Sequence, residues 1–288
     1  YNKATGTLRY ALTPTIDQVL IESSTQKIAD GLDLATALPT ERQGKLVLDS
    51  DLLNGYRLGA IKVGAKQQID VHGALKVADG GDITLFGPVV SVNANLTAHG
   101  GSINAGNLLN QVDLNRSNVV GDVILPGTGR IDVAAGVRLD SSGRWNNLAL
   151  DPSATDGVAY INGGKVSLRS SGDVNLAAGS RVDTSSGATI GLDGKVRGGK
   201  GGDVTVGALG ALDLGAEIRG YGVSAGGTLT LQANQVQIGE SPQAPDAKTL
   251  QLAGDFFNKG FSAYDITGNE GLLVTDGTQV DVSVPAYR

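Results

Sequence analysis

The chain has 288 residues, of which 43 are Gly and none is Cys, and its formal net charge is −6. The acidic balance disfavours nucleic acid, whose phosphates select clustered Lys and Arg, and it also disfavours docking on anionic lipid. Without Cys the chain forms no disulfide and no thiolate metal site, and no run approaches the ~20 apolar residues of a membrane-spanning helix. We therefore expect no nucleic-acid partner and no membrane insertion.

Residues 1–44 carry no visible repeat, and we expect them to form an irregular or capping segment. The first residues, YNKATGTLRYALTPT, lack the basic start, apolar middle and small-residue cleavage site of a signal peptide. If the protein is secreted, the chain is then an internal piece of it. Within this segment, residues 22–44 include ESSTQKIADGLDLATALP, for which we predict a short helix outside the repeats.

Residues 45–288 are expected to consist of one short strand-and-turn unit repeated many times. In GGDVTV, Val204 and Val206 fall on one face of a strand and Thr205 falls on the other, which is the period-2 signature of a strand with one buried side. Each copy of this unit opens on a glycine pair. The copies are GGDITL from Gly80, GGSINA from Gly100, GGKVSL from Gly163, GGDVTV from Gly201 and GGTLTL from Gly226.

A second unit alternates with the first and reads apolar, any, apolar, a short turn, apolar, Asp. Its copies are IDVAAGVRLD from Ile131 and VNLAAGSRVD from Val174, with looser copies IKVGAKQQID from Ile61 and LLVTDGTQVD from Leu272. The pattern predicts one repeated corner that ends each copy on an aspartate: Asp70, Asp140, Asp183 and Asp281. An Asx-type turn accounts for these residues, and a row of calcium ligands is the alternative.

The spacing of the glycine pairs predicts the fold. Pairs lie 20 residues apart at 80 and 100, 38 apart at 163 and 201, and 25 apart at 201 and 226. Three short strands and three turns fit a coil of roughly 19–25 residues, and stacked coils place equivalent strands in parallel at ~4.8 Å. We predict an all-β, right-handed parallel β-helix (a solenoid) of about a dozen coils, with loops outside the helix.

Two further stretches interrupt the repeat, at about residues 144–162 and 240–250, and we expect both to leave the helix as loops or local caps. Loops carry function more often than the scaffold does. The first stretch holds the only Trp of the chain, so the candidate ligand-contact loop is Arg144, Trp145, Asn146 and Asn147. A sugar or protein contact is one interpretation of this loop, and simple capping of apolar surface is the other.

Asp51 to Val71 resembles Asp255 to Val282, since both begin with Asp, two large apolar residues and Asn. The later copy contains Phe256, Phe257 and Phe261, which we expect to pack in or over the core.

The sequence predicts no catalytic residue, no cofactor and no metal site. His72 and His99 are the only histidines, and both lie in repeat context, where polar corners are routine. The serious enzymatic alternative is a polysaccharide-degrading β-helix, which uses Asp clusters or Arg and Lys on one sheet. Its Asp-Asp, GHG and RIK hallmarks are missing. Carboxylates that meet across stacked coils would still permit it.

Glycine-pair strands, AAGxxφDxxG turns, D-[LF]-[LF]-N segments and the absence of Cys together resemble the shaft of filamentous-haemagglutinin-type exoproteins, the passengers of two-partner secretion. The resemblance spans about residues 45–285. It implies a right-handed parallel β-helix on a Gram-negative bacterial surface, exported through a dedicated outer-membrane barrel transporter. The NPNG or NPNL motifs of the secretion domain are absent. The transporter is thus expected to recognise a region not in this sequence, which would derive from the interior or C-terminal half of a longer polypeptide.

We therefore expect a secreted or cell-surface bacterial adhesin segment, without enzymatic activity. Its shaft would mediate attachment or biofilm interactions, with a host-cell receptor or a glycan as partner. The alternative is a polysaccharide-binding or polysaccharide-degrading β-helix protein.

Overall fold

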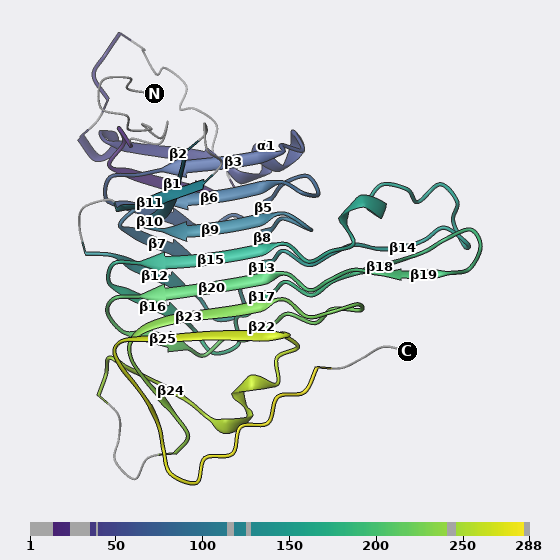
Figure 1. The fold of residues 1–288 in the computed structure, drawn as a ribbon. Helices are drawn as coiled ribbons and strands as arrows, with labels where there is room; N and C mark the ends of the chain where they lie inside the picture. Colours follow the sequence, from purple (N-terminus) through teal and green to yellow (C-terminus); the bar gives the residue numbers. More distant parts are fainter. Residues whose placement is uncertain are drawn as a thin grey trace.

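The computed structural model describes residues 14–23, 35–38, 40–113, 118–124, 128–240 and 246–284. Most strands belong to three parallel sheets, in which they are stacked from the N-terminal to the C-terminal end of the chain (Figure 1). The all-β fold with parallel sheets that the sequence predicts is therefore confirmed.

The three sheets contain seven, five and eight strands. The first sheet has the order β2 (Lys45–Asp49), β1 (Gln18–Glu22), β4 (Gln68–Val71), β7 (Val89–Val92), β12 (Arg130–Val133), β16 (Asp173–Leu176) and β21 (Leu212–Leu214). The second has the order β22 (Glu217–Arg219), β17 (Arg181–Asp183), β13 (Arg138–Asp140), β8 (Leu96–Thr97) and β5 (Leu75–Lys76). The third has the order β24 (Thr249–Leu252), β23 (Thr228–Ile238), β20 (Asp203–Ala208), β15 (Lys165–Ser170), β9 (Ser102–Gly106), β6 (Asp82–Phe86) and β3 (Ala60–Gly64), and β25 (Ala263–Val274) pairs with β23.

The remaining elements lie at the ends of the sheets or leave them. They are the helix α1 (Ser50–Gly55), the 3₁₀ helices η1 (Thr40–Arg42), η2 (Val158–Tyr160) and η3 (Gly254–Phe257), the hairpin strands β10 (Leu108–Asp113) and β11 (Asn118–Ile124), and the strands β14 (Trp145–Asn147), β18 (Ala188–Ile190) and β19 (Val196–Gly198). Among these strands, β10 pairs with β11 and β18 with β19 in the antiparallel sense.

The chain visits the three sheets in a fixed order. It passes from β3 in the third sheet to β4 in the first and β5 in the second, and then returns to β6 in the third. We call one such passage a circuit. Five complete circuits follow one another in the described residues, beginning at β3, β6, β9, β15 and β20. Each circuit adds one strand to each sheet.

The second glycines of the pairs explain why the sequence repeats Gly-Gly. They precede successive strands of the third sheet and lie against one another in a glycine column, Gly81, Gly101, Gly164, Gly202 and Gly227. A Cβ atom on Gly202 would overlap the carbonyl oxygen of Gly164, and one on Gly227 would overlap the carbonyl oxygen of Gly202. Backbone therefore packs on backbone at this corner, which only Gly permits.

The core consists of small and medium apolar side chains that alternate along each strand and stack between strands. Val204 and Val206 are fully buried, while Thr205 is partly exposed. In the third sheet Val204 pairs with Val166 on one side and with Leu229 on the other, and both partners are buried. The inward register that we predicted for this strand is confirmed.

Several expectations require correction. The described residues hold five complete circuits and no sheet of more than eight strands, rather than about a dozen coils, because the hairpin, the excursions at β14 and β18, and both chain ends use residues outside the circuits. Within residues 1–44, β1 is a regular strand of the first sheet, since its alternate apolar residues Val19 and Ile21 reach the core. The helix expected within residues 22–44 and much of the stretch 240–250 lie outside the described residues.

The two similar segments begin in the same way. Residues 50–55 form α1, whose first amides bond to Asp49, and residues 254–257 form η3, and each helical turn precedes a strand of the third sheet. Phe257 and Phe261 are buried and Phe256 packs against the core, as predicted. Edge-to-face contacts join Phe257 and Phe261 to Tyr264.

Candidate functional site

The predicted contact loop lies on a projection that stands away from the three sheets (Figure 1). This arm consists of two segments, residues 143–162 and 187–199. Each segment leaves the sheets at the same point of its circuit, between the second and third sheets, and the two circuits are successive. Its strands have the order β14-β18-β19, with β14 parallel to β18 and β18 antiparallel to β19. The sequence predicted the excursion at 144–162 but not the one at 187–199.

The four predicted residues do not share one face, because they form or adjoin strand β14 rather than a loop. Successive side chains of a strand point to opposite faces. Trp145 and Asn147 therefore share one face of the arm, and Arg144 and Asn146 share the other. The second face is closed, since a Cβ on Gly157 would lie 2.8 Å from the Arg144 Cβ and 3.1 Å from the Asn146 Oδ1.

One contact closes the base of the arm, and two others attach it to the corner before β6. The amide of Arg144 donates to the carbonyl of Tyr160 at 2.8 Å, and the Arg144 guanidinium lies 3.4 Å from an Asp79 carboxylate oxygen. The Tyr160 ring packs on the corner at Gly80, which has a positive φ of 75°. Arg144 is therefore an anchoring residue.

The arm displays unusually exposed apolar side chains. In the described part of the chain the most exposed large hydrophobic side chains are Leu150 at 84%, Leu192 at 72% and Trp145 at 69%, and all three lie on the arm. Val196, also on the arm, is 62% exposed. Apolar side chains gathered on a projecting element mark a contact surface more often than a structural one.

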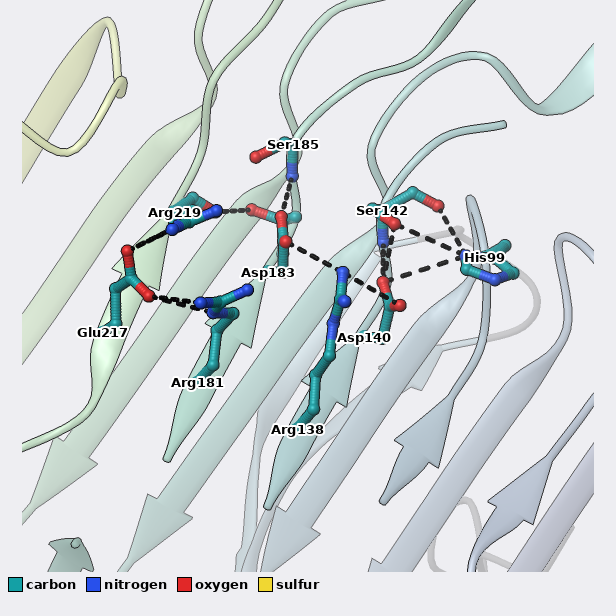
Figure 2. Close-up of polar contacts among 10 residues, drawn as sticks. His99, Arg138, Asp140, Ser142, Arg181, Asp183, Ser185, Glu217 and Arg219 are labelled. Atoms are coloured by element: carbon teal, nitrogen blue, oxygen red, sulfur yellow. Dashed lines mark hydrogen bonds and ion pairs between the residues drawn. The ribbon is translucent and has the colours of Figure 1, made fainter. Parts of the chain in front are cut away.

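A second candidate is a charged ladder on the second sheet, formed by Arg138, Asp140, Arg181, Asp183, Glu217 and Arg219 (Figure 2). The Nη2 of Arg138 lies 3.2 Å from Asp140 on its own strand and donates at 3.0 Å to Asp183 on the next strand. In the same way Arg181 donates from Nε to Glu217 on the next strand at 2.9 Å. Arg138 and Arg181 thus bridge neighbouring circuits.

The Glu217 carboxyl lies between two arginines. The hydrogen bond from Arg219 Nε, at 2.6 Å, is the largest cause that lowers the pKa of the Glu217 carboxyl. Desolvation opposes this shift, and the charge of Arg181 adds to it. A carboxylate held ionised by two cations is a structural ion-pair partner and not a proton donor.

Two aspartates of the ladder form the Asx turns that the sequence predicted. Asp140 Oδ1 accepts from the Ser142 amide at 3.0 Å, and Asp183 Oδ1 accepts from the Ser185 amide at 3.1 Å. The prediction of a single four-residue corner is wrong, because Asp70 lies within β4 of the first sheet and Asp281 lies outside the strands. In the described part of the chain no cluster of His, Asp and Glu is arranged to hold a metal ion.

His99 adjoins the ladder without forming a catalytic triad. Its Nδ1 faces the Ser142 carbonyl at 3.2 Å, the Ser142 hydroxyl at 3.4 Å and Asp140 at 3.8 Å, so one nitrogen meets all three groups. A triad needs the histidine between serine and aspartate, with a separate nitrogen for each. Here Ser142 Oγ donates directly to Asp140 at 2.6 Å. His72, the other histidine, is exposed on a different part of the chain.

Comparisons with known proteins identify no relative of this chain. No protein-family model matches the chain, and neither does any curated protein or solved structure. Within the described residues, none of the helices has the length and apolar character needed to cross a membrane.

Proposed function

We propose that this chain is a segment of a secreted or cell-surface bacterial adhesin, built as a right-handed parallel β-helix shaft. The repeated circuits and the in-register parallel pairing support a helical winding in which each turn covers the apolar side of the previous one. The right hand follows from the strong preference for right-handed crossovers between parallel strands.

The observation that carries this proposal is the arm. An adhesin needs a stiff support that holds a contact surface clear of its own body, and the arm projects from the stacked sheets (Figure 1). The side chains of Trp145, Leu150, Leu192 and Val196 on the arm are exposed. Its base is fixed by Arg144 and Tyr160, so the surface is held in place.

Export through an outer-membrane transporter of the two-partner type belongs to the same proposal and comes from the resemblance to filamentous-haemagglutinin-type proteins. The absence of Cys suits a chain that must stay unfolded during export. Each circuit would fold on the one before it outside the cell, since burial of apolar surface contributes ~25 cal/mol per Å² at every addition.

Attachment of protein-coated beads to epithelial cells and to bacterial biofilms tests this function. Beads that carry the chain should bind, and beads that carry a variant with Trp145, Leu150, Leu192 and Val196 all replaced by Ser should lose most of that binding. Circular dichroism melting checks that the variant remains folded. Wild-type beads that bind no better than albumin-coated beads would refute the adhesive role.

Polysaccharide binding or degradation is the second candidate. It is favoured by the convergence of Asp140 and Asp183 from neighbouring strands on Arg138. The ladder supports this candidate less well than the arm supports adhesion, because all four oxygens of the two carboxylates are engaged by Arg138, Ser142 or Ser185. Incubation with acidic polysaccharides, followed by a reducing-end or unsaturated-product assay, tests it. Turnover that is lost in Asp183→Asn would reverse the ranking.

A further inference from the structure

The open face of the arm has a defined composition. Strand pairing places Trp145, Ala188 and Gly198 in one row and Asn147, Ile190 and Val196 in the next. Ala188 is fully buried, and Gly198 lies against Val223 from the loop after β22. The accessible part of this face is therefore a platform formed by Trp145, Asn147, Ile190 and Val196, which we call the Trp145 platform.

The platform is rigid for a surface so far from the core. Its residues belong to paired strands, and the opposite face is covered by residues around Gly157. The Asn146 amide nitrogen and the Thr189 hydroxyl, on that opposite face, are buried. A side chain held on a supported sheet loses less conformational freedom when a ligand binds than one on a free loop.

The chemistry of the platform favours an uncharged ligand with one apolar face. None of its four side chains is charged, and the indole of Trp145 is 69% exposed. Asn147 Oδ1 accepts from the Leu150 amide at 3.2 Å, which orients the carboxamide. Its amide nitrogen has no hydrogen-bond acceptor among the described residues and supplies donors beside the indole. Sugar rings combine an apolar C–H face with hydroxyl acceptors at the edge.

The size of the platform also favours a small ligand. Neighbouring strands lie ~4.8 Å apart and alternate residues ~7 Å apart, so the platform measures on the order of 7 by 10 Å. That matches one or two pyranose rings. A stable protein interface needs about 800 Å² from each partner, which is roughly ten times the area of the platform.

We infer that the Trp145 platform binds an uncharged sugar residue of a glycan, with the ring stacked on Trp145 and a hydroxyl accepting from Asn147. This inference rests on the proposed adhesive function and names its partner. Affinity for one sugar is weak, on the order of millimolar, because so small a contact offsets little more than the cost of association. Many copies on one surface would supply avidity.

Intrinsic fluorescence tests the inference directly, because Trp145 is the only Trp of the chain. The protein is titrated separately with galactose, glucose, N-acetylglucosamine, sialic acid and a heparin fragment. At least one of the neutral sugars should change the Trp emission saturably, and the charged ligands should not. Asn147→Asp keeps an oxygen for the Leu150 amide and removes the amide donor, so it should weaken this binding about tenfold through the loss of one hydrogen bond to the sugar.

Tyr56→Ala removes an aromatic side chain that is 66% exposed and lies outside the arm, and it should leave the titration unchanged. On an array of neutral glycans Trp145→Phe should retain part of the binding and Trp145→Ala should lose it. The inference would be overturned if no neutral sugar up to 100 mM changed the Trp emission, or if Trp145→Ala bound the glycans as well as the wild type. It would also be overturned if a partner protein still bound the platform after enzymatic deglycosylation.

Bead attachment separates this inference from the proposed function. Attachment that persists in Trp145→Ala would reject the sugar site and leave the adhesive function standing.

Discussion

The glycine column shows how single residues control the approach of successive circuits. Gly164, Gly202 and Gly227 lie where the backbone of one circuit meets the backbone of the next, and no side chain fits between them. The turn at Gly80 needs Gly for a different reason, namely its positive φ of 75°. The two glycines of the pair at 80 and 81 are therefore required for different reasons: the first for its positive φ and the second for the close approach of two backbones.

We expect Gly202→Ala to lower the free energy of unfolding by about 3 kcal/mol, because the new methyl group would overlap the Gly164 carbonyl and only backbone movement relieves it. Urea unfolding followed by circular dichroism measures the change. Gly55→Ala is the matched control, since a Cβ there has no neighbour within 4 Å. Equal stability of the two variants would contradict the close packing of the column.

The register of β20 makes a second prediction at this scale. Val204→Asp places an unpaired carboxylate in the core and should cost about 3–5 kcal/mol. Thr205 is the next residue along the strand and faces outward, so Thr205→Asp should keep the free energy of unfolding within about 0.5 kcal/mol of the wild type. Thermal melting separates the two outcomes, and similar losses in both variants would reject the inward register.

The strands of the second sheet are only two or three residues long, and the charged ladder compensates for their short backbone pairing. Arg138 connects β13 to β17 through Asp183, and Arg181 connects β17 to β22 through Glu217. The ladder aligns each strand with the next, so it contributes to the register of the sheet as well as to its stability.

Arg138→Ala should destabilise the fold by about 1–2 kcal/mol, because it leaves the mostly buried Asp140 and Asp183 without their shared cation. This loss of stability is smaller than that expected for a fully buried pair, because the Arg138 side chain is 41% exposed and screened by solvent. Urea unfolding at low and high salt measures the change.

Arg130→Ala is the control, since the hydrogen-bonded ion pair of Arg130 is with Asp132 of its own strand and the Arg130 side chain is more exposed, at 58%. It should change stability by less than about 0.5 kcal/mol. If both arginine variants lose the same stability, the ladder does not link neighbouring strands.

Sequence patterns located the strands well and the connections between them poorly. The unit from Ile131 crosses from the first sheet to the second, whereas the similar unit from Ile61 crosses from the third to the first. Alternating apolar residues around a turn look alike at any corner, so the pattern placed Asp70 beside Asp140 incorrectly.

The second arm segment, residues 187–199, was missed although a signal existed. The glycine pairs at 163 and 201 lie 38 residues apart, compared with 20 for the pairs at 80 and 100. The extra residues form β18 and β19. Trp145 was singled out by its rarity, and its neighbours were grouped by sequence rather than by the alternating faces of a strand.

At the scale of the whole molecule, stability comes from contacts between neighbouring circuits. The apolar residues of each strand in the third sheet stack on those of the strands on either side, as Val166, Val204 and Leu229 do. Such arrays gain stability with each added repeat and lose it locally when one repeat is damaged. The arm lies outside the three sheets, so its surface can change without a change in the sheets.

The central claim, that successive circuits stack along one axis, is tested most directly by spin-label distances, for which the Cys-free chain is well suited. Lys62, Thr84, Asn104, Ser167, Thr205 and Thr230 are register partners on six successive strands of the third sheet. Nitroxides on Cys at 62 and 205 should lie about 19 Å apart, and those at 62 and 230 about 24 Å apart, because each strand adds ~4.8 Å. Distances that grow by one strand spacing per circuit are the predicted result, and a distance between 62 and 230 equal to or shorter than that between 62 and 205 would contradict the stack.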